Sequence, residues 1–320
     1  MATNGPNSDA AAAVPPIRAP VADTPVAIVT GANSGIGLAV CVALAHEGHT
    51  VYGGMRVTAS ADALLAAAGS VKPPGAIHVV RMDVGNDDSV ATAVAGILAA
   101  TGDRVDVAVA NAGYGERASV EAVPMSAYTD TMNVNFFGAL RLVQACVPSM
   151  RRRRAGRMLG VSSVMGLVGL PFMSSYTASK SAMEGFWESA HSEYKSLGIH
   201  FILVEPGPVS TPLLTRPPKP WSLPAELESN WQAWAVSCRD LIFVHPQTPD
   251  DCAASFVRAV KEPEPALRYM THPPCAEMVR SKMVDLDGKR VAAMALSLVA
   301  TKGSEEGSTQ VPAEAERSDK

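Results

Sequence analysis

The chain has 320 residues, of which 47% are hydrophobic and 18% charged; this balance permits a large buried core and argues against general disorder. Its 27 basic and 31 acidic side chains give a net charge of −4, so no general attraction to nucleic acid is expected. The five cysteines are scattered without a C-x-x-C pair and the seven histidines lack H-E-x-x-H spacing, which predicts reduced thiols, a cytoplasmic location and no metal site.

The two ends of the chain differ from its centre. Residues 1–23 are rich in alanine and proline and hold one basic residue, Arg18, so they suit neither a secretory nor a mitochondrial signal. We expect a disordered extension here, with a plastid-type leader as the open alternative. Residues 301–320 are polar and charged and are expected to form a disordered tail. Residues 24–300 are predicted to form one domain, without an apolar run long enough to span a membrane.

A glycine-rich turn follows the first predicted strand. The strand is Val26–Val29, and a helix is predicted from Ile36 to Leu44. Between them the sequence reads Thr30-Gly31-Ala32-Asn33-Ser34-Gly35-Ile36-Gly37. Glycines between a strand and a helix let the backbone approach a pyrophosphate at the helix N-terminus. Because the spacing is G-x-x-x-G-x-G rather than G-x-G-x-x-G, an ordinary strand-to-helix turn is the alternative when this motif is taken alone.

Strands and helices alternate along the rest of the chain. Strands are predicted at 50–54, 77–83, 105–110, 157–161, 200–204 and 267–270, and helices at 88–100, 125–150, 174–197 and 249–260. This alternation predicts an α/β fold, a doubly wound parallel sheet of the Rossmann type with right-handed crossovers. Ligands of such folds bind beyond the carboxyl ends of the strands. Gly31, Asp83, Asn111, Ser163 and Pro206 all fall at such ends.

The run Tyr176-Thr177-Ala178-Ser179-Lys180 indicates the chemistry. Tyr176 and Lys180 lie four residues apart and share one face of a helix. An ammonium beside a phenol lowers the pKa of the phenol, which makes the tyrosine a usable general acid and base. Ser163, thirteen residues before the tyrosine, comes from another element and can hold the same substrate oxygen. Alone, such a pair is more often a surface pair; together with the glycine turn it predicts proton transfer at an alcohol or ketone.

Taken together, these motifs resemble the short-chain dehydrogenase/reductase family. The resemblance extends over about Thr24 to Ala295, and Ala110 departs from the family's usual second asparagine before Asn111. The matching motifs are the turn at 30–37, Asp83-Val84, Asn111-Ala112-Gly113, Asn135, Ser163, Tyr176, Lys180 and Pro206-Gly207. Within the family, segments 55–56, 164–172 and 205–209 are most similar to the group of the oestrogenic 17β-hydroxysteroid dehydrogenase and the photoreceptor retinol dehydrogenase.

The resemblance implies a role for each of these residues. It assigns catalysis to four polar residues, Asn135, Ser163, Tyr176 and Lys180. Lys180 is also expected to bind the nicotinamide ribose, and Asn135 to hold a water that links the lysine to solvent. Asp83 and Val84 are expected to border the adenine, and Val209 and Thr211 the carboxamide. The remaining expected cofactor contacts are Gly31, Asn33, Ser34, Gly35, Ile36, Gly37, Asn111, Ala112, Gly113, Tyr176, Pro206 and Gly207.

The end of the second strand favours NADP(H) over NAD(H). Enzymes that use NAD usually place Asp or Glu there, where the carboxylate accepts hydrogen bonds from the ribose 2′-OH. Here the place is taken by Met55, followed by Arg56. Because no carboxylate repels a phosphate and a guanidinium is available to bind it, we expect Arg56 to contact the 2′-phosphate. An exposed loop arginine without this role is the alternative.

An apolar substrate lid is predicted at about 211–248. The segment begins with several prolines and carries Trp221, Trp231 and Trp234. A long loop at the edge of an active site is usually functional or disordered, and the tryptophans argue against disorder. A small satellite core is the alternative. With the resemblance, the lid implies a bulky lipophilic substrate that is steroid-, retinoid- or polyketide-like.

The resemblance therefore implies an NADP(H)-dependent oxidoreductase that interconverts a ketone or aldehyde and an alcohol. A catalytically silent NADP(H)-binding redox sensor or scaffold is the alternative, although such proteins typically lose the tyrosine or the lysine. A homodimer is expected through the helices at 125–150 and 174–197, because their apolar residues extend beyond one core-facing stripe. Those residues are Phe136, Phe137, Leu140, Val143 and Val147 on the first helix and Phe186 and Trp187 on the second.

Overall fold

The computed structural model describes residues 16–215, 221, 223–238, 240, 245–284, 293 and 297 of the chain. The predicted tail at 301–320 and residues 1–15 of the predicted extension lie outside the described residues. So do residues 216–220, 222, 239 and 241–244 of the predicted lid, and residues 285–292, 294–296 and 298–300 of the predicted domain.

The sheet has seven parallel strands in the spatial order β3-β2-β1-β4-β5-β6-β7. They are β1 (Val26–Thr30), β2 (Thr50–Met55), β3 (Ala76–Arg81), β4 (Val107–Ala110), β5 (Gly156–Val161), β6 (Ile199–Glu205) and β7 (Arg268–Met270). Each strand lies where the sequence predicted one, with bounds that shift by at most two residues. The prediction of a doubly wound α/β sheet of the Rossmann type is therefore confirmed.

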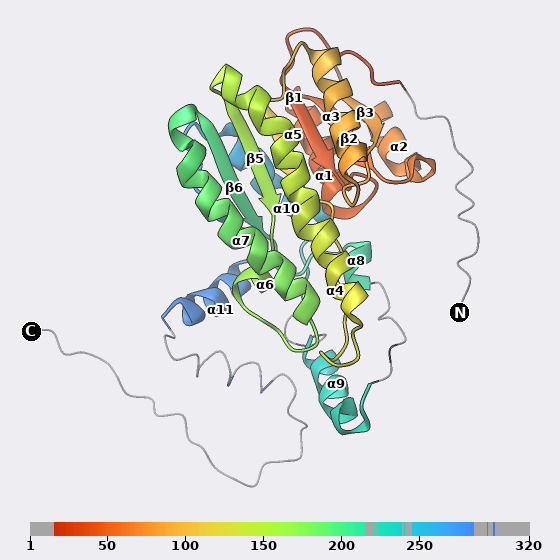
Figure 1. Cartoon of the computed structure of the whole chain (residues 1–320), viewed down its shortest axis with the longest axis vertical. Helices are drawn as coiled ribbons and strands as arrows, with labels where there is room; N and C mark the ends of the chain where they lie inside the picture. Colours follow the sequence, from red (N-terminus) through yellow and green to blue (C-terminus); the bar gives the residue numbers. More distant parts are fainter. Residues whose placement is uncertain are drawn as a thin grey trace, which may run out of the picture.

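Helices cover both faces of this sheet (Figure 1). One face is covered by α3 (Asp87–Thr101), α5 (Gly138–Arg153) and α7 (Ser174–Tyr194), and the other by α1 (Gly35–His46), α2 (Asp62–Ser70) and α10 (Pro249–Lys261). The first core lies between the sheet and α3, α5 and α7, and the second lies between the sheet and α1, α2 and α10. Successive side chains of a strand point to opposite faces, so Ile28 packs in the first core and Ala27 and Val29 pack in the second. Because both faces are covered, every residue of β1 is buried.

Short elements gather beyond the carboxyl ends of the strands, where the arrowheads of β5 and β6 point (Figure 1). They are α6 (Val164–Leu167), α8 (Pro212–Thr215), α9 (Ala225–Ser237) and α11 (Pro273–Met283). The sequence predicted an irregular segment where α9 forms, and it predicted no helix at α2 or α11. The α9 helix follows Pro224 and has acidic residues in its first turn, and α11 has prolines at its first positions, which are both helix-start signals.

The helix predicted at 125–150 is interrupted. It consists of α4 (Met125–Met132), a π-helical turn η2 (Asn133–Phe137) and α5. A single π turn inserted into an α-helix often marks a functional position. Asn135 lies at the centre of this turn and is fully buried. The helix at 174–197 is α7 followed by a 3-10 turn, η3 (Lys195–Leu197), and a second such turn, η1 (Thr58–Ser60), follows β2.

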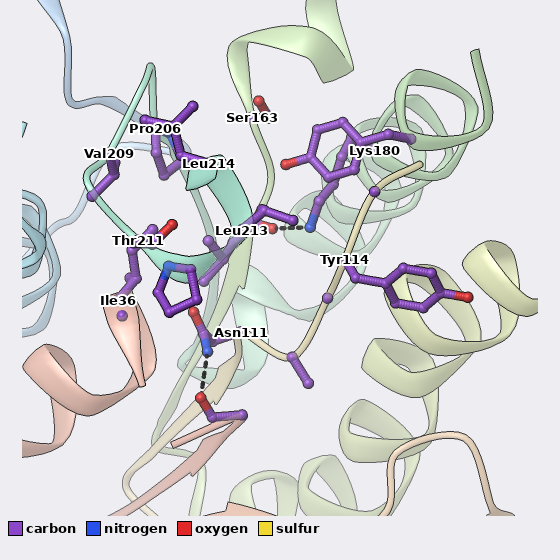
Figure 2. A pocket seen from close by; sticks show the side chains of 18 of the residues that line it. Ile36, Asn111, Tyr114, Ser163, Lys180, Pro206, Val209, Thr211, Leu213 and Leu214 are labelled. Atoms are coloured by element: carbon purple, nitrogen blue, oxygen red, sulfur yellow. Dashed lines mark hydrogen bonds between the residues drawn. The ribbon is translucent and has the colours of Figure 1, made fainter. Parts of the chain in front are cut away.

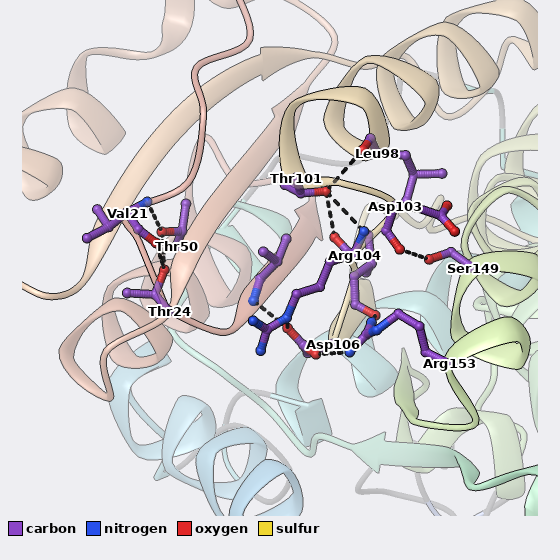
Figure 3. Close-up of polar contacts among 12 residues, drawn as sticks. Val21, Thr24, Thr50, Leu98, Thr101, Asp103, Arg104, Asp106, Ser149 and Arg153 are labelled. Atoms are coloured by element: carbon purple, nitrogen blue, oxygen red, sulfur yellow. Dashed lines mark hydrogen bonds and ion pairs between the residues drawn. The ribbon is translucent and has the colours of Figure 1, made fainter.

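Side-chain hydrogen bonds hold the amino ends of the strands, away from the short elements (Figure 3). The hydroxyls of Thr24 and Thr50 lie 2.7 Å apart, which joins the segment before β1 to β2. Just before β4, the carboxylate of Asp106 accepts a hydrogen bond of 2.7 Å from the backbone N–H of Val26 and pairs with Arg153 of α5. The strand ends opposite the short elements are therefore fixed by polar contacts between elements.

Residues 16–23 contact the domain, so its contacts begin before the predicted boundary at residue 24. The hydroxyl of Tyr52 donates a hydrogen bond of 2.7 Å to the backbone oxygen of Arg18. Ile17 packs against the first core, and its Cδ1 lies 2.5 Å from the position that a Cβ on Gly96 would occupy. The average composition of residues 1–23 indicated disorder and did not single out Ile17, which packs against the domain.

The residues that suggested a dimer face divide into two groups. Val143, Val147 and Trp187 belong to the core of this chain, and Trp187 is fully buried. That part of the argument for free apolar faces was therefore wrong, because these side chains fill the space between helix and sheet. Phe137 is 45% exposed, and Phe136 and Phe186 are half-buried.

Candidate active site

A cavity of about 990 Å³ opens beyond the carboxyl ends of the strands. Every site residue expected from the sequence lines it, except Gly37 and Asn135. The glycine turn forms one part of its wall, and Ser163, Tyr176 and Lys180 form another. Figure 2 shows Ser163 and Lys180 on one side of this space and Ile36, Thr211 and Val209 across from them. Residues that are far apart in the sequence therefore meet around a single cavity.

The turn between β1 and α1 needs its glycines for two different reasons. Gly31 and Gly35 have positive φ angles of 68° and 55°, which L side chains rarely adopt. A Cβ on Gly37 would lie only 2.3 Å from the backbone oxygen of Gly31, so the first turn of α1 packs directly on the loop. Gly37 thus allows α1 to pack closely against the loop outside the cavity lining, whereas Gly31 and Gly35 line the cavity.

Asn111 holds this turn in place from the end of β4. Its Nδ2 donates to the backbone oxygens of Thr30, at 2.8 Å, and of Gly31, at 3.2 Å (Figure 2). In return, the Thr30 hydroxyl accepts hydrogen bonds from the backbone N–H groups of Asn111, at 3.0 Å, and Ala112, at 3.1 Å. The hydrogen bonds of the Asn111 amide therefore hold this part of the cavity wall in place.

The expected adenine end is formed by the segment after β3 and by the loop after β2. The Asp83 carboxylate accepts a hydrogen bond of 3.0 Å from the N–H of Gly85. Val84 is buried against Gly138, where a Cβ would lie 2.9 Å from the Val84 Cβ. Arg56 is exposed and lines the same cavity. Its guanidinium is available at the rim, where a charged group of a ligand would still contact water.

Tyr176, Ser163 and Lys180 are all buried, with exposed fractions of 8%, 7% and 3%. Nζ of Lys180 donates a hydrogen bond of 2.7 Å to the backbone oxygen of Val161. Burial lowers the pKa of Lys180 to about 8, although the carboxylate of Glu184 acts in the opposite direction. A lysine with this pKa can change its charge near physiological pH.

The pKa of Tyr176 differs from the expectation. We expected the neighbouring ammonium to lower it, whereas burial raises it and the hydrogen bond with Ser163 only partly offsets this effect. The reason is that removing a phenolate from water costs more than this hydrogen bond returns. Near neutral pH the side chain is therefore a phenol, which is the form that donates a proton.

Asn135 lies behind the cavity wall rather than in it. Its Oδ1 accepts a hydrogen bond of 2.9 Å from the N–H of Tyr114, and its Nδ2 donates to the Tyr114 oxygen, at 2.8 Å, and to Ser179 Oγ, at 2.9 Å. A Cβ on Gly113 would lie 3.1 Å from Asn135 Oδ1 and 3.5 Å from Lys180 Nζ. Gly113 therefore leaves a small space between the asparagine and the lysine, and Oδ1 retains one lone pair toward that space.

Apolar side chains from α9 and from the segment after α6 form the other end of the cavity. Trp234 and Cys238 are buried together with Leu170, and the ring of Trp234 lies 5.1 Å from that of Trp231 and 5.6 Å from that of Phe172. Sequence reasoning had assigned Trp234 to the substrate end, but it had not placed the other lining residues there. They include Arg117, Met165, Leu170, Met173, Cys238, His272, Cys275 and Met278. No local motif marks them, because α9, α11 and the 164–173 segment meet only in the folded chain.

Two kinds of feature are absent from the described ranges. None of the helices placed there has the length and apolarity needed to cross a membrane. Within the same ranges, no group of histidine, cysteine, aspartate or glutamate side chains is arranged to hold a metal ion.

Residues 25–219 match the family model described as short chain dehydrogenase. The chain belongs to this family. It is 36% identical over 279 residues to retinol dehydrogenase 8 of Bos taurus, covering 84% of this chain and 88% of the relative. It is 34% identical over 275 residues to 17-beta-hydroxysteroid dehydrogenase type 1 of Homo sapiens, covering 82% of each. A solved short-chain dehydrogenase from Streptomyces avermitilis matches 86% of this chain and 97% of its own, with a TM-score of 0.73 and 27% identity.

Membership makes the chain an oxidoreductase of hydroxyl or keto groups from a family that binds a nicotinamide cofactor. It also confirms the resemblance that the motifs predicted, both to the family and to the steroid and retinol dehydrogenase group within it.

Proposed function

We propose that the chain is an NADP(H)-dependent enzyme that interconverts a ketone or aldehyde and an alcohol on a bulky lipophilic substrate. The observation that carries this proposal is the meeting of Ser163, Tyr176 and Lys180 in one cavity that has a glycine turn at one end and apolar side chains at the other. The cavity thus provides a polar reaction centre between a place for a phosphate-bearing cofactor and a place for an apolar substrate.

The residues present fit a nicotinamide dinucleotide. Ser34 ends the glycine turn as the N-cap of α1, so the unpaired N–H groups of the first helical turn are available for a phosphate. Between this turn and the apolar end, Lys180, Val209 and Thr211 line the wall next to the reaction centre and would hold the nicotinamide ribose and carboxamide. When bound, this cofactor supplies hydride chemistry at the carbonyl carbon.

In reduction, the phenol of Tyr176 donates its proton to the substrate oxygen. The Ser163 hydroxyl donates a hydrogen bond to the same oxygen, which orients it and stabilises the charge that develops there. As the proton leaves, negative charge grows on the Tyr176 oxygen, and the nearby Lys180 ammonium stabilises it. In oxidation, the proton moves in the opposite direction.

The preference for NADP(H) is supported by the residues at the end of β2. Met55 is buried and Arg56 is exposed at the cavity rim, so no carboxylate of this strand end is placed to repel a 2′-phosphate. An arginine–phosphate contact contributes about 1.5–3 kcal/mol. This corresponds to a preference of roughly tenfold or more over the cofactor that lacks the phosphate.

The substrate proposal rests on the apolar end of the cavity. Trp234 and Leu170, with the methionines Met165, Met173 and Met278, give a large and adaptable surface that suits a steroid-, retinoid- or polyketide-like ring or chain. We propose that α9 acts as the lid, because Trp234 on this helix and Cys238 directly after it form part of the cavity wall.

We also propose a homodimer in the cytoplasm. The ring centroids of Phe136 and Phe137 lie 5.2 Å apart, and those of Phe136 and Phe186 lie 6.1 Å apart, so one aromatic cluster spans the π turn and α7. The exposed side of Phe137 would be covered by a second copy. The cytoplasmic proposal is supported by the five cysteines, which are all free.

Turnover of a panel of lipophilic ketones, aldehydes and alcohols tests the proposal. NADPH or NADP⁺ should support turnover of at least one member, and Tyr176→Phe should abolish it. Tight NADPH binding in calorimetry without turnover of any member would instead support the redox sensor or scaffold.

A further inference from the structure

Three glutamates surround Arg268, and none of these four residues lines the cavity. Nη1 of Arg268 contacts the carboxyl groups of both Glu184 and Glu205, and Nη2 contacts Glu188. Glu205 is fully buried and Glu184 is 5% exposed, whereas the side chain of Glu188 is 55% exposed. Glu184 follows Lys180 by one turn of α7. The proposed proton transfer uses none of these four residues.

The buried carboxyl groups of Glu184 and Glu205 need one more hydrogen than Arg268 supplies to satisfy their hydrogen bonds. Arg268 offers them a single nitrogen, so each has one oxygen at Nη1 and one oxygen elsewhere. In the part of the chain that the structure describes, Oε1 of Glu184 and Oε2 of Glu205 are buried without a hydrogen-bond partner. Ionised carboxylates have no proton to share, and two buried negative charges beside one positive charge are costly. One proton held between them removes both problems.

Few other charged groups face this pair. Lys180 and Glu188 lie on either side of Glu184 along α7, and Arg268 comes from β7. From the end of β5 and from α6, the uncharged residues Ser162 and Gly166 lie beside Glu184: a Cβ on Gly166 would lie 2.7 Å from Ser162 Oγ and 3.0 Å from Glu184 Cγ. After β7, His272 directs its Nδ1 to the thiol of Cys275, and from α11 Lys282 is bound to the oxygen of Leu167.

We propose that Glu205 and Glu184 form a carboxyl–carboxylate pair in which Glu205 carries the proton and Glu184 stays ionised as a positioning residue for Lys180. The Glu205 hydroxyl donates to Glu184, and Arg268 donates to both. The kinetic part of this inference rests on the proposed function, because it acts through the Lys180 ammonium.

The electrostatic surroundings support this assignment. Burial raises the pKa of Glu205 to about 7, helped by the nearby Glu184 and opposed by Arg268. The charge of Glu184 in turn raises the pKa of Lys180, against the effect of burial. Glu184 is the less buried of the two and lies on the same helix as Lys180, so it is the partner that stays ionised, and its charge keeps Lys180 charged to a higher pH than burial alone would allow.

The kinetic test compares Glu184→Gln with Glu188→Gln, in the full-length chain. Both substitutions remove a carboxylate from Arg268, but only Glu184 is buried near Lys180, so Glu188→Gln is the matched control. Glu184→Gln removes a negative charge that raises the pKa of Lys180. We therefore expect the alkaline limb of the kcat profile for ketone reduction to move to lower pH by about one unit. Glu188→Gln should leave it in place. An unmoved limb in a folded Glu184→Gln protein would overturn the positioning role.

The second test uses stability and needs no turnover. The folded-state pKa of Glu205, about 7, is above its ordinary value of 4.5, so the folded chain keeps a proton that the unfolded chain releases. This contribution to stability is complete below about pH 4.5 and is lost as the pH rises to about 7. Glu205→Gln, which keeps a donor toward Glu184, should remove this decline from the urea-unfolding free energy.

The two tests separate the possible failures. If the wild-type protein shows no turnover, the proposed function fails, but the stability comparison still decides whether Glu205 holds a proton. A decline with pH that is the same in Glu205→Gln as in the wild type would overturn the proton-sharing pair, whatever the activity. If Glu184→Gln does not fold, the shortened but charged variant Glu184→Asp replaces it. Because its carboxylate lies farther from Lys180, this variant should move the alkaline limb of the kcat profile to lower pH by less than Glu184→Gln. An unmoved limb would count against the positioning role of Glu184.

Discussion

Lys180 lies beside Tyr176 with its Nζ 5.7 Å from the centroid of the phenol ring. The lysine is held there by the backbone oxygen of Val161, the last residue of β5, and the same helix, α7, carries both side chains. A strand end and a helix therefore fix the ammonium near the phenol before any ligand binds. Burial of this charge lowers the pKa of Lys180, and the carboxylate of Glu184 offsets the effect only in part.

Replacing Tyr176 by phenylalanine should abolish turnover while cofactor binding survives. The substitution removes the proton donor and almost no volume, so the cavity keeps its shape. We expect the variant to retain less than about a tenth of the wild-type kcat, equivalent to at least about 1.4 kcal/mol of barrier. Steady-state kinetics and calorimetry with NADPH measure the two effects separately, and a larger residual rate would mean that another group donates the proton.

The rate of ketone reduction should fall as the pH rises through about 8. Lys180 is the group responsible, because its pKa is lowered to about 8 and its ammonium stabilises the charge that forms on Tyr176. Below this pH the lysine is charged and the rate should be level; above it the charge is lost. The kcat of the wild-type enzyme with saturating NADPH gives the profile, and a level rate to well above this pH would show that Lys180 stays charged.

Much of this fold was predictable because the strands are buried on both faces. Such strands read as continuous apolar runs, as in Val26–Thr30, and their alternation with helices leaves few topologies. The interruption of the helix at 133–137 was not predictable, because no residue type marks a π turn. Helix α9 was missed for a different reason: prolines dominate the start of its segment, and the helix buries only one of its residues, Trp234.

The polar half of the site was predictable, whereas the sequence indicated only the tryptophan-bearing segment of the apolar half. Gly31, Ser163 and Tyr176 belong to local motifs whose spacing itself expresses the chemistry. The wall around Trp234 combines side chains from separate segments, and each looks like an ordinary core residue in the sequence. The pKa of Tyr176 was misjudged because adjacency of a lysine is visible in the sequence and the depth of burial is not.

Gly37→Ala should destabilise the protein, whereas Gly69→Ala should not. A Cβ on Gly37 would lie 2.3 Å from the oxygen of Gly31 and 2.4 Å from Nδ2 of Asn111, so the turn must shift. We expect a loss of about 1–3 kcal/mol and weaker NADPH binding. Gly69 lies in α2 with no atom within 4 Å of its Cβ position, so alanine there should stabilise by about 0.5–1 kcal/mol. Urea unfolding compares the two, and equal effects would contradict the packing argument.

Two deletions at the N-terminus should show that residues 16–20 contribute to stability and that residues 1–15 do not. Removal of 1–20 takes away Ile17, which packs on the first core, and Arg18, which accepts a hydrogen bond from Tyr52. We expect this deletion to lower stability by about 1–2 kcal/mol, from lost apolar burial and one hydrogen bond. Removal of 1–15 keeps both contacts and should leave the melting temperature unchanged. Equal melting temperatures for the two truncated chains would show that these contacts contribute nothing.

Arg56→Ala should weaken the binding of NADPH much more than that of NADH. Arg56 lies at the cavity rim, after the buried Met55 that ends β2, and only NADPH carries the 2′-phosphate. We expect the Kd for NADPH to rise roughly tenfold or more, as for the loss of about 1.5–3 kcal/mol, with little change for NADH. Ser34 lines the same cavity, and its hydroxyl can donate to the phosphate, which would soften the loss without removing it.

Met55→Asp should go further and reverse the preference. A carboxylate at the end of β2 would accept hydrogen bonds from the ribose 2′-OH of NADH and repel the phosphate of NADPH. Because Arg56 is exposed, salt should weaken NADPH binding more than NADH binding in the wild type, and this difference should shrink in Arg56→Ala. Titrations of both cofactors at low and high salt measure these effects. Equal affinities of the wild type for the two cofactors, unchanged by Arg56→Ala, would reduce Arg56 to a surface side chain and remove the physical basis for NADP(H).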